Sequence, residues 1–373
     1  MIYFDNSATS LMRPPQVGEA FLYALEHFGN AGRSFYHAVM EANRALYKTR
    51  QEVAALIGLD DPLKVAFTSS ATESLNLVIR SLIRPEDQVI TTVTEHNAVL
   101  RPLYLRGCDL KFLEADDRGS LLLDDMESLL TPKTRFLVAN HGSNVTGNIN
   151  DIGRLYRFCQ EHQLLFILDI AQTFGIYDLA IHEADIFCFT GHKGLLGPQG
   201  TGGIIVNGDI HFPLVKTGGA GSGSFNRFQG EAMPDVFEAG TLNSQGLYAM
   251  KKGIEFIRDQ GLEAIHEREM SLARRFYEGI CDLEGLILYG DYASQDRLPL
   301  VSLNLEGWDS ADLAYKLWED YEIATRAGAH CAPLLHKHFK TETQGMVRFS
   351  FSQFNREDEI DQGIRALQEL ANR

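Results

Sequence analysis

The sequence lacks the features that identify several large classes of protein. No run reaches the roughly 18 apolar residues that a membrane-spanning helix needs, and the N-terminus, MIYFDNSATS, reaches Asp5 before an apolar signal-peptide segment develops. The five cysteines are an odd number and contain no CxxC pair, which argues against a disulfide framework and for a reducing compartment. We therefore expect a cytoplasmic protein.

Positive charge is also scarce. The chain has 34 Lys and Arg against 50 Asp and Glu, a formal net charge of −16. Such a surface repels phosphate backbones and anionic lipid headgroups, so neither nucleic acid nor a membrane is an expected partner. Hydrophobic residues make up 45% and charged residues 23% of the 373, which excludes a disordered or collagen-like chain. The length suits two domains, or one large α/β domain with an appendage.

Neither a GxxxxGK[ST] loop nor an intact GxGxxG follows any predicted strand, which disfavours nucleotide cofactors. What the sequence does contain is an alternation of short β-branched runs with segments of helical period. The runs are 64–68, 88–93, 109–115, 135–140, 164–170, 184–190 and 202–206. Most are apolar along their whole length, as burial on both faces of a mostly parallel sheet requires. The sequence therefore predicts an α/β fold with its central sheet between helices.

The pattern changes in the last third of the chain. A long helical pattern begins near 243, and short strands return near 286–290, 300–307 and 346–352. This shift predicts a second, smaller α+β domain with its boundary near residue 250. The predicted units are an N-terminal segment that packs with the small domain (1–13), a large domain (14–250) and a small domain (251–373).

Two other segments have a clear local pattern. Residues 37–57 form one amphipathic helical pattern that Gly58 ends, and this helix carries no obvious chemistry. Residues 216–224, KTGGAGSGS, are too rich in glycine for regular structure and are predicted to be a mobile loop.

The segment 68–76, TSSATESLN, is a candidate phosphate-binding site. Small and hydroxylic residues follow a strand directly and begin an amphipathic helix, so Ala71 and Thr72 would lie at the positive end of the helix dipole. A plain helix cap with Glu73 in the first turn is the alternative interpretation.

Two charged residues follow the next buried strands. Asp169 ends the most hydrophobic strand, LLFILD, where α/β folds bind ligands, although a buried Asp can also cap a turn. Lys193 lies in the glycine-rich segment 189–203, FTGHKGLLGPQGTGG, where it is a candidate Schiff-base amine rather than a solvated charge. An amine, a partner for a pyridine nitrogen and a phosphate cradle together are what pyridoxal phosphate demands.

These segments resemble one family across nearly the whole chain: the pyridoxal-phosphate-dependent class V aminotransferase type, in its cysteine desulfurase and selenocysteine lyase branch. The matching segments are YFDNSAT (3–9), FTSSATES (67–74), TEHNAVLRP (94–102), SNVTGNIND (143–151), LDIAQTFG (168–175), FTGHKGLLGPQGTGG (189–203), FEAGTLN (237–243), RAGAHCAP (326–333) and VRFSFSQFN (347–355). The resemblance implies the fold of pyridoxal-phosphate transferases, with a large cofactor-binding domain and a small α+β domain.

The resemblance also implies roles for individual residues. Lys193 would bind the cofactor covalently and later take the α-proton, Asp169 would pair with the pyridinium nitrogen, and His96 would stack on the ring. The remaining implied contacts are Gln172 and Asn144 to the phenolic oxygen, Ala71, Thr72, Thr190 and His192 to the phosphate, Thr241 to the phosphate of a neighbouring subunit, and Arg348 and Asn144 to the substrate, whose carboxylate Arg348 would clamp. A homodimer with sites at its interface follows.

Cys331 is the most discriminating residue. Packing suffices to explain the other cysteines, which are Cys108, Cys159, Cys188 and Cys281. Cys331 lies instead in a polar segment with Arg326 and His330 nearby, which could favour its thiolate. The resemblance makes Cys331 the sulfur-accepting cysteine of the short-loop branch. Leu334 and Leu335 after Pro333, and Thr190 where serine is common, depart from the family pattern without removing a needed group.

The resemblance implies an enzyme of sulfur metabolism that converts L-cysteine to L-alanine and leaves a persulfide on Cys331 for an acceptor protein or thiol. A selenocysteine lyase, or another lyase or aminotransferase on a small amino acid, is the first alternative. The second is a non-catalytic scaffold or metal-binding protein. His330, Cys331, His336 and His338 are donors close in sequence, but their spacing matches no structural zinc pattern.

Overall fold

The computed structural model describes residues 1–32, 34–219 and 224–372. It contains a seven-stranded sheet in the order β2-β8-β7-β6-β5-β3-β4, in which β8 runs antiparallel to both of its neighbours and the other adjacent pairs are parallel. The strands are β2 (Val65–Thr68), β3 (Gln88–Thr92), β4 (Asp109–Leu113), β5 (Thr134–Asn140), β6 (Leu165–Asp169), β7 (Ile186–Thr190) and β8 (Gly202–Val206). Each corresponds to one predicted run, and the predicted α/β fold class is confirmed.

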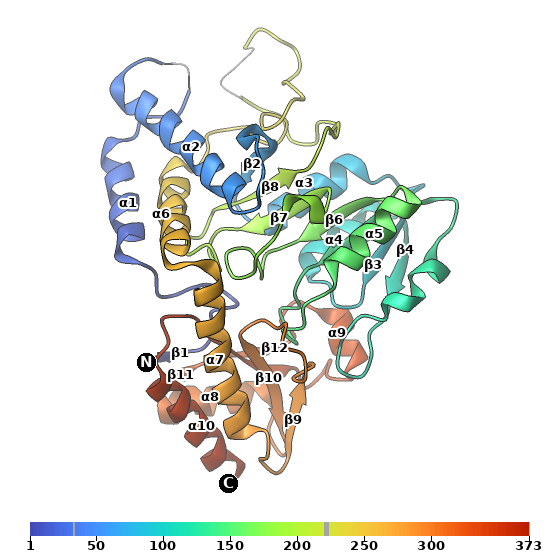
Figure 1. The fold of residues 1–373 in the computed structure, drawn as a ribbon, viewed down its shortest axis with the longest axis vertical. Helices are drawn as coiled ribbons and strands as arrows, with labels where there is room; N and C mark the ends of the chain where they lie inside the picture. The colour runs from blue at the N-terminus through green and yellow to red at the C-terminus, as the bar shows by residue number, and fades with distance from the viewer. Residues whose placement is uncertain (33, 220–223, 373) are drawn as a thin grey trace.

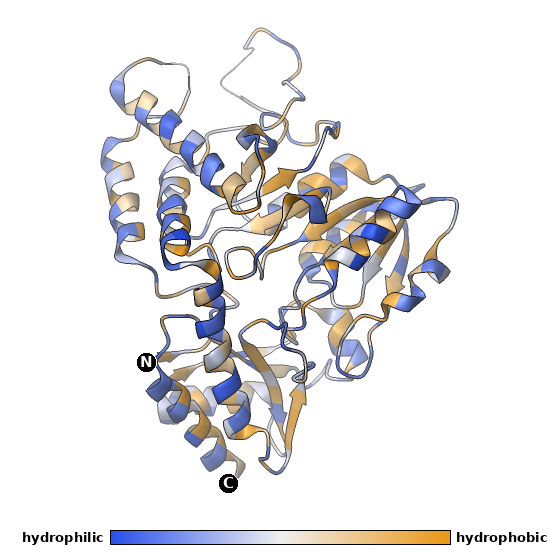
Figure 2. Cartoon of the chain, in the orientation of Figure 1, coloured by the Kyte–Doolittle hydropathy of each residue, from blue (hydrophilic) through white to orange (hydrophobic). Residues whose placement is uncertain are grey.

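Alternate residues of these strands enter two hydrophobic cores, one on each face of the sheet. On β6, for example, Phe166 and Leu168 belong to one core and Ile167 to the other, and all three are fully buried. Figure 2 shows the consequence, since the central strands are hydrophobic while the outer faces of the helices are hydrophilic. Continuous apolar strands thus fit a sheet covered on both faces.

Helices cover both faces of this sheet (Figure 1). They are α1 (Pro15–His27), α2 (His37–Ala55), α3 (Ala71–Leu82), α4 (Asn97–Arg106), α5 (Ile152–His162) and α6 (Ser244–Gln260), with short 3-10 helices at Pro62–Lys64, Leu123–Leu129 and Ile181–Glu183. The apolar faces of α3 and α4 contribute to one core, and those of α2, α5 and α6 to the other. Helix α1 packs on the outside of α6.

A four-stranded antiparallel sheet in the order β12-β13-β10-β9 forms the core of the C-terminal part. The helices and strands of this C-terminal part are α7 (Leu262–Ile280), β9 (Leu286–Tyr289), β10 (Leu300–Leu305), α8 (Ser310–Tyr321), β12 (Arg326–Gly328), α9 (Pro333–His338), β13 (Met346–Ser350) and α10 (Glu357–Ala371). Helices α7, α8 and α10 cover this sheet. The first residues of the chain lie here too, because β1 (Ile2–Tyr3) pairs with β11 (Ile323–Ala324).

The boundary expected near residue 250 falls inside α6, which packs on α1 and α2 beside the seven-stranded sheet. Helix α6 ends and α7 begins at Gly261, and Figure 1 shows the two helices joining the two sheets. Ile265 of α7 still belongs to the core of the large sheet, whereas Leu272 and Phe276 belong to that of the small sheet. We propose that the boundary lies between Gly261 and Leu272, where the packing partner changes, in place of residue 250. Residues 220–223 of the predicted glycine-rich loop lie outside the described residues. No helix among the described residues is both long and apolar enough to cross a membrane.

Candidate active site

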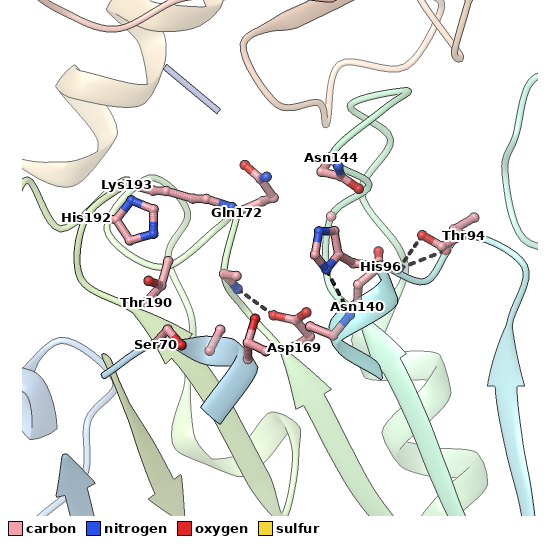
Figure 3. A pocket seen from close by; sticks show the side chains of 15 residues that line it. Ser70, Thr94, His96, Asn140, Asn144, Asp169, Gln172, Thr190, His192 and Lys193 are labelled. Atoms are coloured by element: carbon pink, nitrogen blue, oxygen red, sulfur yellow. Dashed lines mark hydrogen bonds between the residues drawn. The ribbon is translucent and has the colours of Figure 1, made fainter. Parts of the chain in front are cut away.

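A cavity of about 90 Å³ lies at the carboxyl ends of β5, β6 and β7, the edge where parallel sheets bind ligands (Figure 3). Most of the site residues expected from the sequence line it. The lining residues are Ser70, Ala71, Thr72, Thr94, His96, Ala98, Asn140, Gly142, Asn144, Asp169, Ala171, Gln172, Thr190, His192 and Lys193. Segments far apart in the sequence thus converge on one small volume.

Asp169 provides a buried carboxylate at the floor of this cavity. It ends β6, and its Oδ1 accepts a hydrogen bond from the backbone N–H of Ala171 at 2.9 Å. Among the described residues, no group donates a hydrogen bond to Oδ2. Burial raises the pKa of Asp169, while the Ala171 N–H and the Lys193 ammonium oppose that shift. A cationic ring nitrogen at this oxygen would provide the missing partner.

Lys193 lies in the loop that follows β7. Among the described residues its amine has no hydrogen-bond partner, whereas its backbone carbonyl accepts from Ser10 Oγ at 2.9 Å. Burial lowers the pKa of Lys193 from 10.5 to about 8; Asp169 opposes this shift, and Arg348 and Arg326 add to it. A much larger fraction of this amine than of an ordinary lysine is therefore neutral, and so nucleophilic, near neutral pH.

The start of α3 faces the same cavity. Ser70 is the N-cap, and its Oγ accepts a hydrogen bond from the Glu73 N–H at 3.2 Å. Glu73 in turn forms an ion pair with Lys216 at 2.8 Å. The helix cap and the anion site are therefore compatible, because the backbone amides of Ala71 and Thr72 remain at the positive end of the helix.

Thr190 and His192 form another wall of the cavity. His192 Nδ1 lies 3.1 Å from the hydroxyl of Thr9, which belongs to the N-terminal segment. Burial, assisted by Lys193, lowers the pKa of His192 to about 4, so its ring is neutral near pH 7. The ring can therefore donate or accept a hydrogen bond without bringing a second positive charge to the site.

His96 is the N-cap of α4, and its ring enters the cavity above Asp169 (Figure 3). Its Nδ1 accepts a hydrogen bond from the Ala98 N–H at 3.0 Å. Burial, assisted by Lys193, lowers its pKa to about 4, so the ring is neutral and carries its proton on Nε2.

Gln172 and Asn144 occupy the rim. Gln172 Nε2 donates to the Ser7 carbonyl at 3.2 Å, and Asn144 Nδ2 donates to the His330 carbonyl at 2.8 Å. The Asn144 hydrogen bond therefore links the loop after β5 to the loop after β12, in the C-terminal part of the chain, at the mouth of the cavity.

Cys331 follows His330 directly and is exposed. Its carbonyl accepts a hydrogen bond from the Asn97 N–H at 2.7 Å, one residue beyond His96. His330 and Cys331 both adopt left-handed conformations, with φ of 49° and 58°, which side chains rarely adopt. These contacts hold the backbone of Cys331 in a strained turn, while Cys331 itself is not among the residues that line the cavity.

Arg348 does not line the cavity. It is fully buried on β13, where Nη1 donates to the backbone carbonyl of Asn144 at 2.8 Å and Nη2 to Asp5 Oδ1 at 3.0 Å. Thr241 lines a separate hollow together with Arg50 and Glu238. Within one chain the structure does not bring Thr241 to the other candidate residues.

The candidate metal ligands have separate partners. His330 Nε2 contacts the Arg326 carbonyl, His336 Nδ1 contacts Thr341, and His338 Nε2 donates to the Asp116 carbonyl. Over the described parts of the chain, no three His, Cys, Asp or Glu side chains gather as metal ligands.

Asn140, Glu95 and Asp5 belong to the site region but are missing from the sequence-based set. Asn140 ends β5 directly opposite Asp169, so the strand-end argument used for Asp169 could have found it. Glu95 is fully buried and accepts hydrogen bonds from the backbone and side-chain amides of Asn140, at 2.9 Å each. Nothing in the sequence around Glu95 predicts that it is buried, and nothing around Asp5 predicts its contact with Arg348.

The residues present fit pyridoxal phosphate. Asp169 offers a carboxylate oxygen without a donor, Lys193 a half-buried amine without a hydrogen-bond partner, and α3 an N-terminus for a phosphate. Among the described residues, Asp169 and Lys193 form no direct hydrogen bond with each other, so both groups remain available to a ligand. The cavity therefore provides the three binding groups that this cofactor needs: a carboxylate, an amine and a phosphate site.

Comparisons with known proteins agree with this geometry. The family model for aminotransferase class-V matches residues 2–362. A probable cysteine desulfurase of Pyrococcus abyssi is 31% identical to the chain, over 99% of the chain and 94% of the relative. A cysteine desulfurase of Cronobacter sakazakii is 30% identical, over 98% and 92%.

Solved structures give the same result. The apo structure of a cysteine desulfurase from Thermococcus onnurineus NA1 has a TM-score of 0.92 and 32% sequence identity, and the match covers 100% of this chain and 94% of that one. The cysteine desulfurase CsdA from Escherichia coli has a TM-score of 0.88 and 26% identity, over 99% and 94%.

Proposed function

The chain belongs to the class V aminotransferase family, and from this premise we propose that it is a pyridoxal-phosphate-dependent cysteine desulfurase that converts L-cysteine to L-alanine. The sulfur passes to Cys331 as a persulfide. The hydrogen bonds that join the Cys331 loop to the cavity, from Asn97 and Asn144, carry this proposal. An enzyme of this family that did not transfer sulfur to the protein would not need a cysteine held there.

Nine residues that line the cavity would hold the cofactor. Lys193 would bind it covalently, Asp169 would pair with the pyridinium nitrogen, and His96 would cover the ring. The amides of Ala71 and Thr72 at the start of α3, with the side chains of Thr190 and His192, would hold the phosphate. Gln172 and Asn144 would contact the phenolic oxygen. When bound, pyridoxal phosphate supplies an electron sink for negative charge that develops on the amino-acid α-carbon.

The protein's own groups perform the proton and sulfur transfers. Lys193, whose pKa burial lowers to about 8, takes the α-proton at Nζ. The Cys331 thiolate attacks the substrate sulfur, so that an S–S bond forms as the C–S bond breaks. One proton then goes to the β-carbon that lost sulfur, balancing the proton that left the Cys331 thiol, and Lys193 Nζ returns the other to the α-carbon. The overall change is L-cysteine plus Cys331 thiol to L-alanine plus Cys331 persulfide.

The proposal includes a homodimer in the cytoplasm. Thr241 lies in a hollow separate from the cavity of its own chain, which supports a role at the phosphate of a neighbouring subunit. A second thiol, on a protein or a small molecule, collects the sulfur. The exposure of Cys331 supports such a transfer.

Mass spectrometry after brief exposure of the cofactor-loaded protein to L-cysteine, without other thiols, tests the function. We expect one added sulfur on the Cys331 peptide and an equal amount of alanine. Cys331→Ala should retain the cofactor and lose both products, whereas the control Cys281→Ala, which removes a partly buried thiol, should retain both. A loaded protein that forms neither product contradicts the proposal and directs the search to selenocysteine and other amino acids.

A further inference from the structure

Arg326 and Arg348 face each other across two antiparallel strands. They are register partners on β12 and β13, and like charges placed directly opposite in a sheet destabilise it. Arg348 is fully buried, which increases the cost of leaving its charge without a counter-ion.

Asp5 provides that counter-ion. Its Oδ1 accepts a hydrogen bond from Arg348 Nη2 at 3.0 Å, and its Oδ2 lies 3.6 Å from Arg326 Nη1. One carboxylate therefore bridges two guanidinium groups and leaves the trio with one net positive charge. This is the arrangement that a bound carboxylate ligand would make with the same two arginines.

Backbone hydrogen bonds to Ser350 hold Asp5 in this position. Ser350 N–H donates to the Phe4 carbonyl at 2.7 Å, and Asn6 N–H to the Ser350 carbonyl at 3.5 Å, so the main chain on either side of Asp5 is held. Its side chain keeps 16% exposure, whereas that of Arg326 keeps 49%. The backbone is therefore fixed on both sides of Asp5, so displacement of its carboxylate would require movement of the side chain alone.

Arg348 contacts a residue that lines the cavity, and the charges of both arginines act on Lys193. Arg348 Nη1 donates to the backbone carbonyl of Asn144, which lines the cavity. Both guanidinium charges help to lower the pKa of the Lys193 amine and the Asp5 charge raises it, so all three groups act on that amine. An amino acid whose amine lies at Lys193 would therefore have its carboxylate on the side of these two groups.

We propose that Asp5 is an internal substitute for the substrate carboxylate: it occupies the site between Arg326 and Arg348 in the free enzyme, and the amino-acid carboxylate displaces it. This inference rests on the proposed function, because it assigns the carboxylate subsite of that reaction. Asp5 then sets specificity, since a ligand must carry its own carboxylate to replace the lost contacts. Displacement also lowers the apparent affinity for amino acids by the fraction of sites that Asp5 holds closed.

Binding of L-alanine and of L-alaninamide to the cofactor-loaded protein tests this inference. Both bring the amine, but only alanine brings a carboxylate, and neither contains a thiol. Their dissociation constants are measured from the change in cofactor absorbance. In Asp5→Asn we expect alanine to bind about tenfold more tightly relative to alaninamide, because the competing charge is gone while the side-chain shape remains.

Asp291→Asn is the matched control. Asp291 Oδ1 lies 3.2 Å from Arg118 Nη1, a comparable ion pair, and neither residue lines the cavity. Its alanine-to-alaninamide ratio should equal that of the wild type. Asp5→Ser provides a second neutral variant if Asn at position 5 does not fold. A purely structural Asp5 would weaken both ligands equally and leave the ratio unchanged, and an unchanged or reduced ratio in the folded variants overturns the inference.

Alanine formation from L-cysteine by the wild type is measured in parallel. Failure of the proposed function would appear there, as a loaded wild type that makes no alanine. Failure of the Asp5 inference alone would appear as an active wild type whose ligand ratio does not respond to Asp5→Asn.

Discussion

Gly175 and Gly194 pass so close to each other that a Cβ on Gly175 would lie 2.8 Å from the Gly194 carbonyl oxygen. A Cβ on Gly194 would in turn approach the Phe174 carbonyl closer than the 3.0 Å below which something must shift. The residue after Lys193 is therefore glycine because the backbone after Asp169 leaves no room for a side chain. This contact fixes the lysine loop against the turn that follows β6.

Gly194→Ala should consequently displace the lysine loop. We expect a loss of unfolding free energy of about 1–3 kcal/mol, typical of overpacking, and cofactor incorporation reduced more than in proportion to the folded fraction. Thermal unfolding and the cofactor-to-protein ratio measure the two effects. Gly18→Ala is the control, since Gly18 lies in α1 with open space around it and the change should be neutral or stabilising. Full cofactor content in Gly194→Ala would contradict this argument.

The strand-end pattern explains why much of the site could be predicted from the sequence. Asp169 and Lys193 both follow apolar runs, and the carboxyl ends of parallel strands meet at one edge, so local pattern and sheet geometry bring them together. The same logic extends to Asn140, which is the register partner of Asp169.

The remainder of the site depends on contacts that no local pattern encodes. Asp5 meets Arg326 and Arg348 only because β1 pairs with β11 and the chain then continues along β13. The strands β1 and β12 are two and three residues long, too short to show a period. Likewise, Arg348 matches a family motif, but its pairing with Asp5 appears only in the folded structure.

The lowered pKa of the Lys193 amine predicts a pH dependence of cofactor uptake. Its pKa is lowered from 10.5 to about 8, so the amine is protonated below about 8 and nucleophilic above it. The rate at which apoprotein takes up pyridoxal phosphate covalently, followed by absorbance, should rise with pH with a midpoint near 8. In Asp169→Asn the midpoint should fall, because the carboxylate that raises the pKa of Lys193 is removed. Lys193→Ala should show no covalent band, and a wild-type midpoint near 10.5 would refute the burial argument.

His96 has two separable roles. Its Nδ1 caps α4 through the Ala98 N–H, and its ring enters the cavity. His96→Asn replaces the ring with another good N-cap residue, whereas His96→Ala removes the cap as well, at a cost of about 1 kcal/mol of unfolding free energy. We expect both variants to lose cofactor on dialysis up to about tenfold faster than the wild type, since ring stacking contributes roughly 0.5–1.5 kcal/mol.

Only His96→Ala should melt at a lower temperature. Equal destabilisation of the two His96 variants would show that the cap contributes nothing, and wild-type retention of cofactor in His96→Asn would remove the ring from the cofactor site. The melting temperatures are measured on the apoproteins, so that differences in cofactor binding do not affect the comparison of stability.

Glu95 is a buried acid whose protonation stabilises the fold. Burial raises its pKa from 4.5 to about 8, with a further contribution from the charge of Asp169. The folded state therefore holds the proton more tightly than the unfolded state, so this stabilisation is fully present below pH 4.5 and is lost as pH rises through about 8. Glu95→Gln cannot titrate, yet its amide oxygen can still accept the hydrogen bond from the Asn140 N–H.

The melting temperature of the wild type should accordingly fall relative to that of Glu95→Gln between pH 5 and pH 9, by at least about 2 °C, which corresponds to a change of roughly 1 kcal/mol in a chain of this size. Thermal melts of the apoproteins across this range measure the difference. The exposed Glu161 provides the control, because Glu161→Gln should follow the wild type at every pH. Parallel curves for wild type and Glu95→Gln would mean that Glu95 is ionised in the folded protein, and its charge would then have to be compensated by the hydrogen bonds from Thr92 and Asn140 alone.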